Sequence, residues 1–278
     1  MTQTTSRPTD SRVVSASAPQ TSLAPAVYIV GAGPGDPELL TVRGQRLLQQ
    51  ADVVVYANSL VPEQILGWVR PDAEQIRTAS LTLEEIVPLM IDRVRAQKSV
   101  VRLQSGDPSL YSAIHEQVQV LVEAEVPFEV VPGISAFQAA AAKLNVELTI
   151  PGLVQSIILT RISGRTQVPE TEELASLAAH QSSLCLYLSA RHVEAAQAKL
   201  MEHYPAETPV AIAYRVGWPD ERIEVVPLSE MAATTQAHNL IRTTLYLVSP
   251  ALQAAPARSR LYNPSHSHLF RPRPARAE

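Results

Sequence analysis

The sequence is poor in cysteine and has no long apolar run. Its single cysteine, Cys185, cannot form an internal disulfide or build a thiolate metal or iron–sulfur site. No apolar run approaches the roughly 18 residues that a membrane-spanning helix needs. The first 25 residues contain no apolar core of the kind found in secretory signals. We therefore expect a protein of a reducing compartment, the cytoplasm, with no membrane partner.

Excess positive charge is also missing. The 278 residues include 23 Lys and Arg against 27 Asp and Glu, a net charge of −4 at pH 7. A nucleic-acid-binding surface needs a basic patch and a high isoelectric point, so we expect no nucleic-acid partner. The charge is uneven, because residues 256–278 carry five arginines and one glutamate. This tail is either a solvated arm or an arm that closes over an anionic ligand or pairs with a second subunit.

The composition, with 46% apolar and 18% charged residues, is typical of a folded protein. In the first half of the chain, apolar strands alternate with helices, which predicts a mostly parallel α/β sheet. The expected strands are residues 26–30, 52–56, 100–103 and 128–131. The expected helices are residues 36–50, 82–94, 109–123 and 134–143.

A second α/β unit follows a break at Pro151-Gly152. Two neighbouring strands without a helix between them, 210–214 and 222–226, indicate an antiparallel part of its sheet. The other expected strands are 156–160, 184–188 and 243–248, and the expected helices are 170–179, 192–202 and 228–234. The sequence thus predicts two α/β domains with a cleft between them: a disordered leader (1–25), an N-terminal domain (26–150), a C-terminal domain (151–252) and a basic tail (253–278).

A glycine-rich loop, GAGPG at residues 31–35, joins the first strand to a helix that Asp36 can cap. A dinucleotide-binding motif would have its third glycine where Asp36 stands. It would also have an acidic residue at the end of the second strand, whereas Asp52 begins that strand. The common methyltransferase fold would have an acidic residue where Ile29 stands. A nicotinamide site and a purely structural turn remain the alternatives for this loop.

Two further loops follow strand ends, at residues 105–108 (SGDP) and 131–135 (VPGIS). In an open α/β sheet, ligands bind outside the carboxyl ends of the strands. The free N–H groups at a helix start suit a carboxylate or a phosphate. Three such loops in one domain predict a site for a ligand with an anionic end.

These motifs also carry a family resemblance. VYIVGAGPGDPELLTVRG, VVRLQSGDPSLYSAI and VVPGISAFQAAAA, in that order and spacing, resemble the tetrapyrrole (corrin/porphyrin) methyltransferases, which are S-adenosylmethionine enzymes of cobalamin and siroheme synthesis. ASLTLEEI, ELTIPGLVQSIILTRISGRTQVPE, SLAAHQSSLCLYLS and SRLYNPSHSHLFR resemble the members that methylate precorrin-4 at C-11, or its cobalt complex in the anaerobic route. The resemblance covers about residues 26–271 and implies two α/β domains around a cleft, in a homodimer.

The resemblance implies that S-adenosylmethionine is the cofactor, bound between the domains, and that S-adenosylhomocysteine is the product. Since the sulfonium already activates the methyl group, the enzyme's main task is alignment. We assign no catalytic nucleophile, general base or metal, and the pair His266 and His268 is not assigned as a metal site. The cofactor-binding residues implied by the motifs are Pro34, Ser105, Gly106, Asp107, Leu110, Ser135, Ala136, Leu188, Ala213 and Thr244.

The implied substrate is a flexible macrocycle with many carboxylates. Arginine pairs with a carboxylate through two parallel hydrogen bonds. Arg161 and Arg165 are the first candidates for substrate binding, and Arg102 and Arg215 are further ones. Outside this class, the chain could be a nicotinamide-binding oxidoreductase or a non-catalytic ligand-binding protein.

Overall fold

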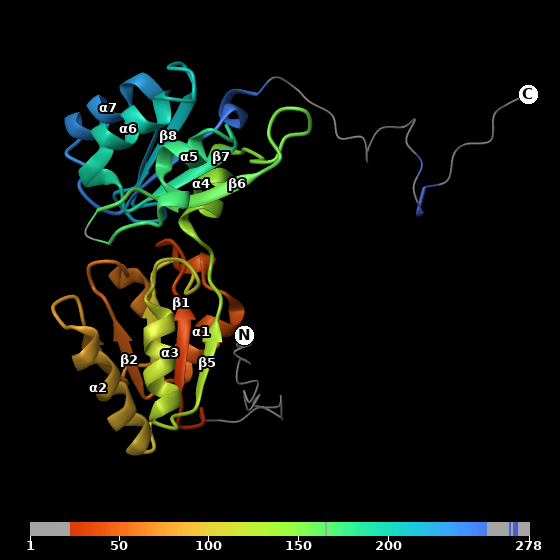
Figure 1. Cartoon of the computed structure of the whole chain (residues 1–278). Helices are drawn as coiled ribbons and strands as arrows, with labels where there is room; N and C mark the ends of the chain where they lie inside the picture. The colour runs from red at the N-terminus through yellow and green to blue at the C-terminus, as the bar shows by residue number, and fades with distance from the viewer. Residues whose placement is uncertain (1–22, 165, 255–266, 268, 272–278) are drawn as a thin grey trace, which may run out of the picture.

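The structure is a computed structural model that describes residues 23–164, 166–254, 267 and 269–271. The predicted leader up to residue 22, Arg165, His266, His268 and most of the basic tail lie outside the described residues. Two bodies, each built on a five-stranded sheet, lie one above the other in Figure 1. Among the described residues, no helix has the length and apolar character that crossing a membrane requires.

The first sheet is parallel throughout, with the strand order β3-β2-β4-β1-β5. Its central strands are buried on both faces, as the continuous apolar runs predict. The strands are β1 (Val27–Gly31), β2 (Val53–Tyr56), β3 (Glu74–Arg77), β4 (Val100–Gln104) and β5 (Phe128–Val131).

Helices cover both faces of this sheet. On one face, α1 (Val42–Gln50) and the 3-10 helix η2 (Glu63–Trp68) pack against Tyr28 and Val30. On the other face, α2 (Leu83–Arg95) and α3 (Ile114–Glu123) pack against Val27 and Ile29. The neighbouring strands β1 and β4 therefore lead to helices on opposite faces. Such a switch point is where an open α/β sheet binds ligands.

The second sheet is mixed, with the order β6-β7-β10-β8-β9. β6 and β7 are parallel and the other pairs are antiparallel, which confirms the expected antiparallel part. The strands are β6 (Ile157–Arg161), β7 (Ser183–Tyr187), β8 (Pro209–Tyr214), β9 (Arg222–Pro227) and β10 (Thr244–Val248).

One helix covers the inner face of the second sheet. The alanines of α4 (Ala136–Leu144) pack there against Cys185 and Leu245, so the lone cysteine is a core residue. Since α4 lies with this sheet in Figure 1, the packing of the second body begins before residue 151, where the sequence placed the boundary. The opposite face is covered by α5 (Leu174–Ala178), α6 (Val193–Met201) and α7 (Met231–Ala237). Short 3-10 helices adjoin these elements: η3 (Glu170–Glu172), η4 (Ala190–His192), η5 (Leu228–Glu230) and η6 (Pro250–Gln253).

Several details differ from the sequence prediction. The helix expected over residues 170–179 is split at extended Glu173 into η3 and α5. The helix expected over residues 36–50 is split into η1 (Pro37–Leu39) and α1, because extended Thr41 caps α1 by accepting a hydrogen bond from the Gly44 N–H at 3.0 Å. The helix expected from residue 109 begins at Ile114, since Tyr111 and Ala113 have left-handed backbone angles. Strand β3 was not predicted, because its polar sequence EQIR has no apolar run.

Candidate functional site

The glycine loop after β1 is paired with the loop after β4. The Gly33 N–H donates to the Gly106 carbonyl at 3.2 Å, and the Gly106 N–H donates to the Gly33 carbonyl at 2.8 Å. Both glycines have positive φ angles, 73° and 67°, which residues with a Cβ rarely adopt. The two motifs that the sequence placed at neighbouring strand ends therefore form one backbone unit.

The loop after β5 packs against this unit with no space to spare. A Cβ on Gly133 would lie 2.3 Å from the Gly106 carbonyl oxygen, and one on Gly31 would lie 2.5 Å from the Gly133 nitrogen. Real side chains do not tolerate such distances. Only glycine allows the three loops to meet, as the prediction of one ligand-binding edge requires.

Asp107 fastens the second loop to the third. Its carboxylate accepts hydrogen bonds from the Gly133 N–H at 2.9 Å, from the Ser109 N–H at 2.8 Å and from the Ser109 hydroxyl. Burial favours a higher pKa, but the bonds from Ser109 and Gly133 outweigh it and leave the pKa of Asp107 below its ordinary value. The carboxylate is thus charged, and the protein itself supplies its hydrogen-bond donors.

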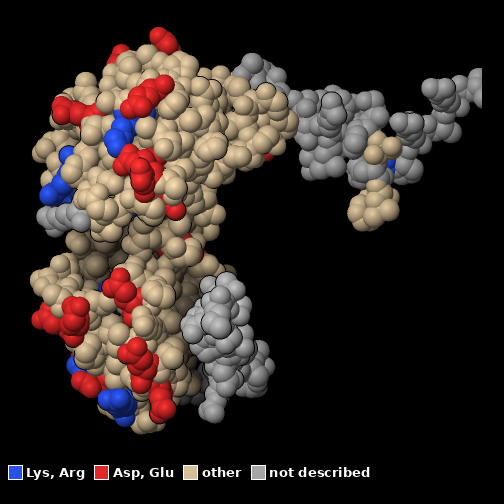
Figure 2. Space-filling model, in the orientation of Figure 1, with Lys and Arg blue, Asp and Glu red and all other residues tan. Residues whose placement is uncertain are grey.

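The second sheet presents one edge to these loops. Because β6, β7 and β8 run in one direction and β10 runs in the opposite one, the last residues of β6, β7 and β8 lie on the same side of the sheet as the first residue of β10. We call this row of strand ends the edge that faces the loops. Arg161, Leu188 and Thr244 therefore lie at this edge, and Ala213 packs in the same apolar cluster as Ala136. Figure 2 shows that the molecular surface is hollowed between the two bodies.

Tyr187, at the end of β7, contacts both the start of α4 and the loop after β4. Its hydroxyl lies 2.8 Å from the Ser135 hydroxyl and accepts a hydrogen bond from the Phe137 N–H at 3.2 Å. Its ring centroid lies 5.5 Å from that of Tyr111, in the loop after β4. Burial, with smaller effects from its neighbours, raises the pKa of Tyr187 to about 12, so the phenol is neutral at physiological pH.

A second connection closes over the glycine loop. The Trp218 indole donates to the Pro34 carbonyl at 3.2 Å. The Gln64 amide donates to the carbonyls of Gly35 and Gly217, at 2.7 and 2.9 Å. A Cβ on Gly35 would lie 2.4 Å from the Trp218 ring, so this glycine is also required. Sequence reasoning missed Tyr187, Trp218 and Gln64, because no local pattern marks a residue that acts across a domain junction.

Apolar surface remains open beside these contacts. The exposed fractions of Leu188 and Tyr111 are 58% and 45%. Both have left-handed backbone angles, with φ of 53° and 54°. Non-glycine residues in this conformation cluster at ligand sites. These side chains offer the kind of surface on which a flat apolar group packs.

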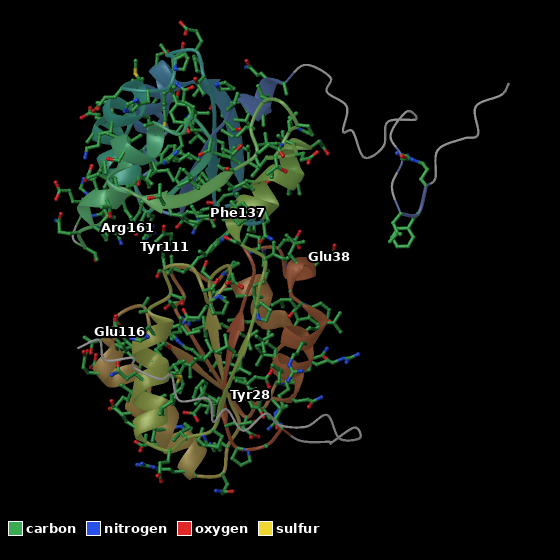
Figure 3. The ribbon with its side chains drawn as sticks, turned by 45° about the vertical axis from the view of Figure 1, so that its right-hand side comes forward. Tyr28, Glu38, Tyr111, Glu116, Phe137 and Arg161 are labelled. Carbon is green, nitrogen blue, oxygen red and sulfur yellow. The ribbon has the colours of Figure 1, made fainter. Side chains whose placement is uncertain are left out.

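The predicted arginines differ in their surroundings. Arg161 donates to the Thr166 carbonyl at 3.3 Å and forms no ion pair with a described carboxylate. Figure 3 shows it across from Tyr111 at the junction of the bodies. Arg215 is already engaged, since its guanidinium lies 4.2 Å from the Trp218 ring centroid and forms an ion pair with Asp220. Arg165 lies outside the described residues.

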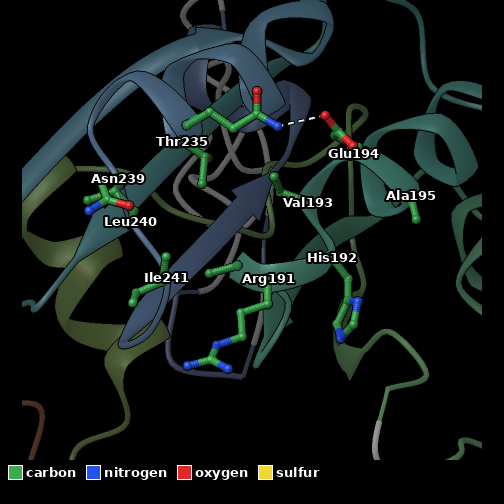
Figure 4. Close-up of a pocket in the computed structure, with 11 residues that line it drawn as sticks. Arg191, His192, Val193, Glu194, Ala195, Thr235, Asn239, Leu240 and Ile241 are labelled. Carbon is green, nitrogen blue, oxygen red and sulfur yellow. Dashed lines mark hydrogen bonds between the residues drawn. The ribbon is translucent and has the colours of Figure 1, made fainter.

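A cavity of about 680 Å³ lies between η4 and the start of α6 on one side and the end of α7 and residues 239–241 on the other (Figure 4). Arg191 and His192 line it, together with Asn239 and Ile241. His192 also lies against the turn at Gly164, where an added Cβ would be 3.2 Å from its Nε2. Arg191 was not predicted, because a single arginine after a strand carries no pattern. Over the described part of the chain, no three His, Cys, Asp or Glu side chains are grouped as metal ligands.

Comparison with known proteins agrees with this arrangement. Residues 26–232 match the family model described as tetrapyrrole (corrin/porphyrin) methylases. A Pseudomonas aeruginosa protein named precorrin-4 C(11)-methyltransferase is 44% identical over 247 residues, which cover 88% of this chain and 98% of that one.

Two solved structures are also similar. The X-ray structure of a cobalamin biosynthetic enzyme, cobalt precorrin-4 methyltransferase, is 43% identical with a TM-score of 0.79, covering 83% of this chain and 96% of that one. Uroporphyrin-III C-methyl transferase from Thermus thermophilus, complexed with S-adenyl homocysteine, is 30% identical with a TM-score of 0.69, covering 82% and 99%. With its two α/β domains and interlocked glycine loops, the chain belongs to the tetrapyrrole methylase family.

Proposed function

We propose that the protein transfers a methyl group from S-adenosylmethionine to C-11 of precorrin-4, in cobalamin biosynthesis. The observation that carries this proposal is the junction where three interlocked loops of the first sheet face one edge of the second. The 44% identity to a protein named precorrin-4 C(11)-methyltransferase supports the choice of substrate. The T. thermophilus relative, which is complexed with S-adenyl homocysteine, supports the choice of cofactor.

The junction suits the proposed cofactor. S-adenosylmethionine, when bound, supplies a methyl group that its sulfonium already activates. Leu188 offers open apolar surface for the flat adenine. The residues that we propose for cofactor binding are Pro34, Ser105, Gly106, Asp107, Leu110, Ser135, Ala136, Leu188, Ala213 and Thr244.

Within this set, the residues differ in what they do. Asp107 and Gly106 hold the loops together and so position the cofactor, because their polar groups are already bonded within the protein. The protein's contribution to the rate is then alignment of the methyl group with the accepting carbon, held by a rigid frame.

The basic side chains on the second body suit a substrate with many carboxylates. Arg161, Arg191 and His192 lie at or beside the edge that faces the first body, and none forms an ion pair with a described carboxylate. We propose that Arg161, together with Arg165, binds substrate carboxylates. The acidic side chains spread over the face in Figure 2 make these local cations the attractive points for an anion.

Two alternatives to this proposal, a cobalt-bearing substrate and a nicotinamide cofactor, differ in their support. A cobalt-bearing substrate is favoured by the 43% identity to cobalt precorrin-4 methyltransferase, so both forms of the substrate belong in the assay. A nicotinamide cofactor is disfavoured, since a pyrophosphate needs close approach to the glycine loop. Trp218 and Gln64 occupy that approach, and the Asp36 carboxylate accepts a bond from the Glu38 N–H at 2.9 Å.

A turnover assay tests the proposal. The protein is incubated with S-adenosylmethionine carrying a ¹³C-labelled methyl group and with precorrin-4 or its cobalt complex. We expect mass spectrometry to detect one added methyl group and NMR to place the label on C-11. Binding of S-adenosylhomocysteine without transfer to either substrate would favour the non-catalytic ligand-binding protein instead.

We further propose that two copies of the chain assemble in the cytoplasm. The outer strands β5 and β6 carry the exposed apolar residues Val130 and Ile157 at open sheet edges, which natural proteins usually cover. Light scattering should therefore give about twice the chain mass of 30.2 kDa. A mass equal to that of one chain would rule out the stable dimer.

A further inference from the structure

Arg102, in the middle of β4, is an arginine inside the first body. Only 7% of its surface is exposed. Its strand neighbours Val101 and Leu103 pack on the α1 face of the sheet, whereas Val100 packs against α2 and α3. Because side chains alternate along a strand, the Arg102 side chain points toward α2 and α3.

The buried guanidinium has fewer hydrogen-bond partners than a buried charged group needs. Its Nη1 donates to the Thr78 hydroxyl at 2.9 Å, and its Nε is buried without any partner. No described carboxylate forms an ion pair with it. Other arginines of the same body are paired with carboxylates: Arg43 with Glu129, Arg70 with Asp52, Arg77 with Glu63 and Arg93 with Glu74.

Such a group is costly to keep. Burying a charge without a counter-ion destabilises a protein by several kcal/mol, and replacing it with an apolar group of similar shape is often neutral or stabilising. Burial lowers the pKa of Arg102 to about 10, so the side chain still carries its charge at neutral pH. An anion that binds here would supply the missing partner.

Polar side chains lie near Arg102 at the ligand-binding edge, although its neighbours on the adjoining strands, Ile29 and Val55, are apolar. Thr78 follows the end of β3, and Arg102 lies two residues before the end of β4. On the same side of the sheet, the Gln104 amide donates to Gln117 at 3.4 Å, and Gln117 donates to the Ser112 carbonyl at 3.1 Å. We call Thr78, Arg102, Gln104 and Gln117 the polar recess. It lies at the start of the loop that carries Asp107.

We propose that the polar recess binds an alkyl carboxylate, with Arg102 as its counter-ion. The inference rests on the proposed function, which supplies two carriers of this group: the acid side arms of the tetrapyrrole and the amino-acid end of S-adenosylmethionine. The Arg102 guanidinium would donate to this carboxylate, because among the described residues its hydrogen bond goes to the Thr78 hydroxyl and no carboxylate is paired with it.

Arg102→Met tests the proposal, with Arg93→Met as the matched control because Arg93 is paired with Glu74 at 2.6 Å. Three quantities are measured for each protein: the Tm without ligand, the Kd of S-adenosylhomocysteine, and the KM and kcat for precorrin-4. For Arg102→Met we expect a Tm equal to or above that of the wild type, whereas Arg93→Met lowers the Tm and changes neither affinity.

The ligand measurements identify the carrier of the carboxylate. A rise in KM of about 10- to 100-fold, typical of losing a charge-assisted hydrogen bond, with an unchanged Kd assigns the recess to the substrate. A similar rise in Kd assigns it to the cofactor. If wild-type protein binds and turns over while Arg102→Met changes neither constant, the recess proposal is wrong. If wild-type protein itself neither binds nor turns over, the proposed function fails.

A second variant covers the case in which Arg102→Met does not fold. Arg102→Lys keeps the charge but loses the planar arrangement of donors that matches a carboxylate. We expect it to fold and to raise KM or Kd about tenfold. Wild-type constants in a folded Arg102→Lys protein would contradict the proposal.

Discussion

Asp107 joins two loops of the first body through hydrogen bonds within the protein. Its carboxylate accepts three hydrogen bonds from Ser109 and Gly133, which join two of the three loops. These bonds favour the charged form and leave the pKa of Asp107 below its ordinary value, although burial acts in the opposite direction. Asp107 therefore stabilises the folded state only while it is ionised.

The first prediction concerns Asp107→Asn. At pH 7 we expect the free energy of unfolding to fall by about 1–2 kcal/mol, because charge-assisted hydrogen bonds become neutral ones. A lowered pKa stabilises the folded state fully above the unfolded value, near 4, and this stabilisation is lost as the pH falls through the folded value. The difference in Tm between wild type and variant should thus shrink below about pH 4. A difference that is constant from pH 7 to 3 would contradict the ionic role.

Tyr187 gives the second prediction. In Tyr187→Phe, the Ser135 hydroxyl and the Phe137 N–H lose their partner. Leaving buried polar groups unpaired should cost about 1–3 kcal/mol in the free energy of unfolding. Since the phenol stays neutral with a pKa of about 12, this loss should not vary between pH 6 and 9. Denaturant unfolding at several pH values measures both quantities, and a strong pH dependence would show that another group is involved.

The site residues also differ in whether the sequence alone could predict them. The positions of the glycine loops and of Asp107 at strand ends were predictable, because each motif is local, whereas the hydrogen bonds of Asp107 to Ser109 and Gly133 were not predicted. Tyr187 and Trp218 were not, since their partners lie 52 and 184 residues away. Arg102 appeared in the sequence as one of several arginines, and only its burial distinguishes it.

At the scale of elements, the three loops after β1, β4 and β5 behave as one unit. Gly33 and Gly106 exchange backbone hydrogen bonds, and Gly133 packs against Gly31 and Gly106. The sequence predicted the strands and the order of the loops, because buried parallel strands have continuous apolar runs. It missed strand β3, where packing at the sheet edge prevails over polar composition, and it extended the helix α3 into a strained loop.

The third prediction uses Gly133→Ala, with Gly67→Ala as its control. The new Cβ would lie 2.3 Å from the Gly106 carbonyl oxygen, so the loops must separate. We expect a loss of about 1–3 kcal/mol in the free energy of unfolding, typical of overpacking, and loss of S-adenosylhomocysteine binding. Gly67 has no atom within 4 Å of its Cβ position, and its variant should stay within about 0.5 kcal/mol of wild type. Equal effects of the two variants would contradict the interlocked-loop account.

At the scale of the whole molecule, each body has its own apolar core, and the two meet through hydrogen bonds, through the ring contact of Tyr111 with Tyr187 and through the packing of Leu39 on the second body. Gln64 is central among them, since its amide reaches both Gly35 in the first body and Gly217 in the second. The sequence predicted the two α/β domains from the break near Pro151. It did not predict that α4 packs on the second sheet, because an alanine-rich helix carries no sign of which sheet it will cover.

The fourth prediction is that Gln64→Ala loosens the junction while both cores remain folded. We expect the Tm to change by only a few degrees, since Gln64 is half-buried and belongs to neither core. S-adenosylhomocysteine, which we propose to bind between the bodies, should bind about 10-fold more weakly. A variant that melts far below the wild type would instead show that Gln64 belongs to the folding core of the first body.

The central claim is that the junction of the two bodies is a site for S-adenosylmethionine. Calorimetric titration of the wild-type protein with S-adenosylhomocysteine, and with NAD as the control ligand, tests it most directly. The account predicts saturable binding of S-adenosylhomocysteine at one site per chain and no heat from NAD. Folded protein that binds NAD, or that fails to bind S-adenosylhomocysteine, would contradict it.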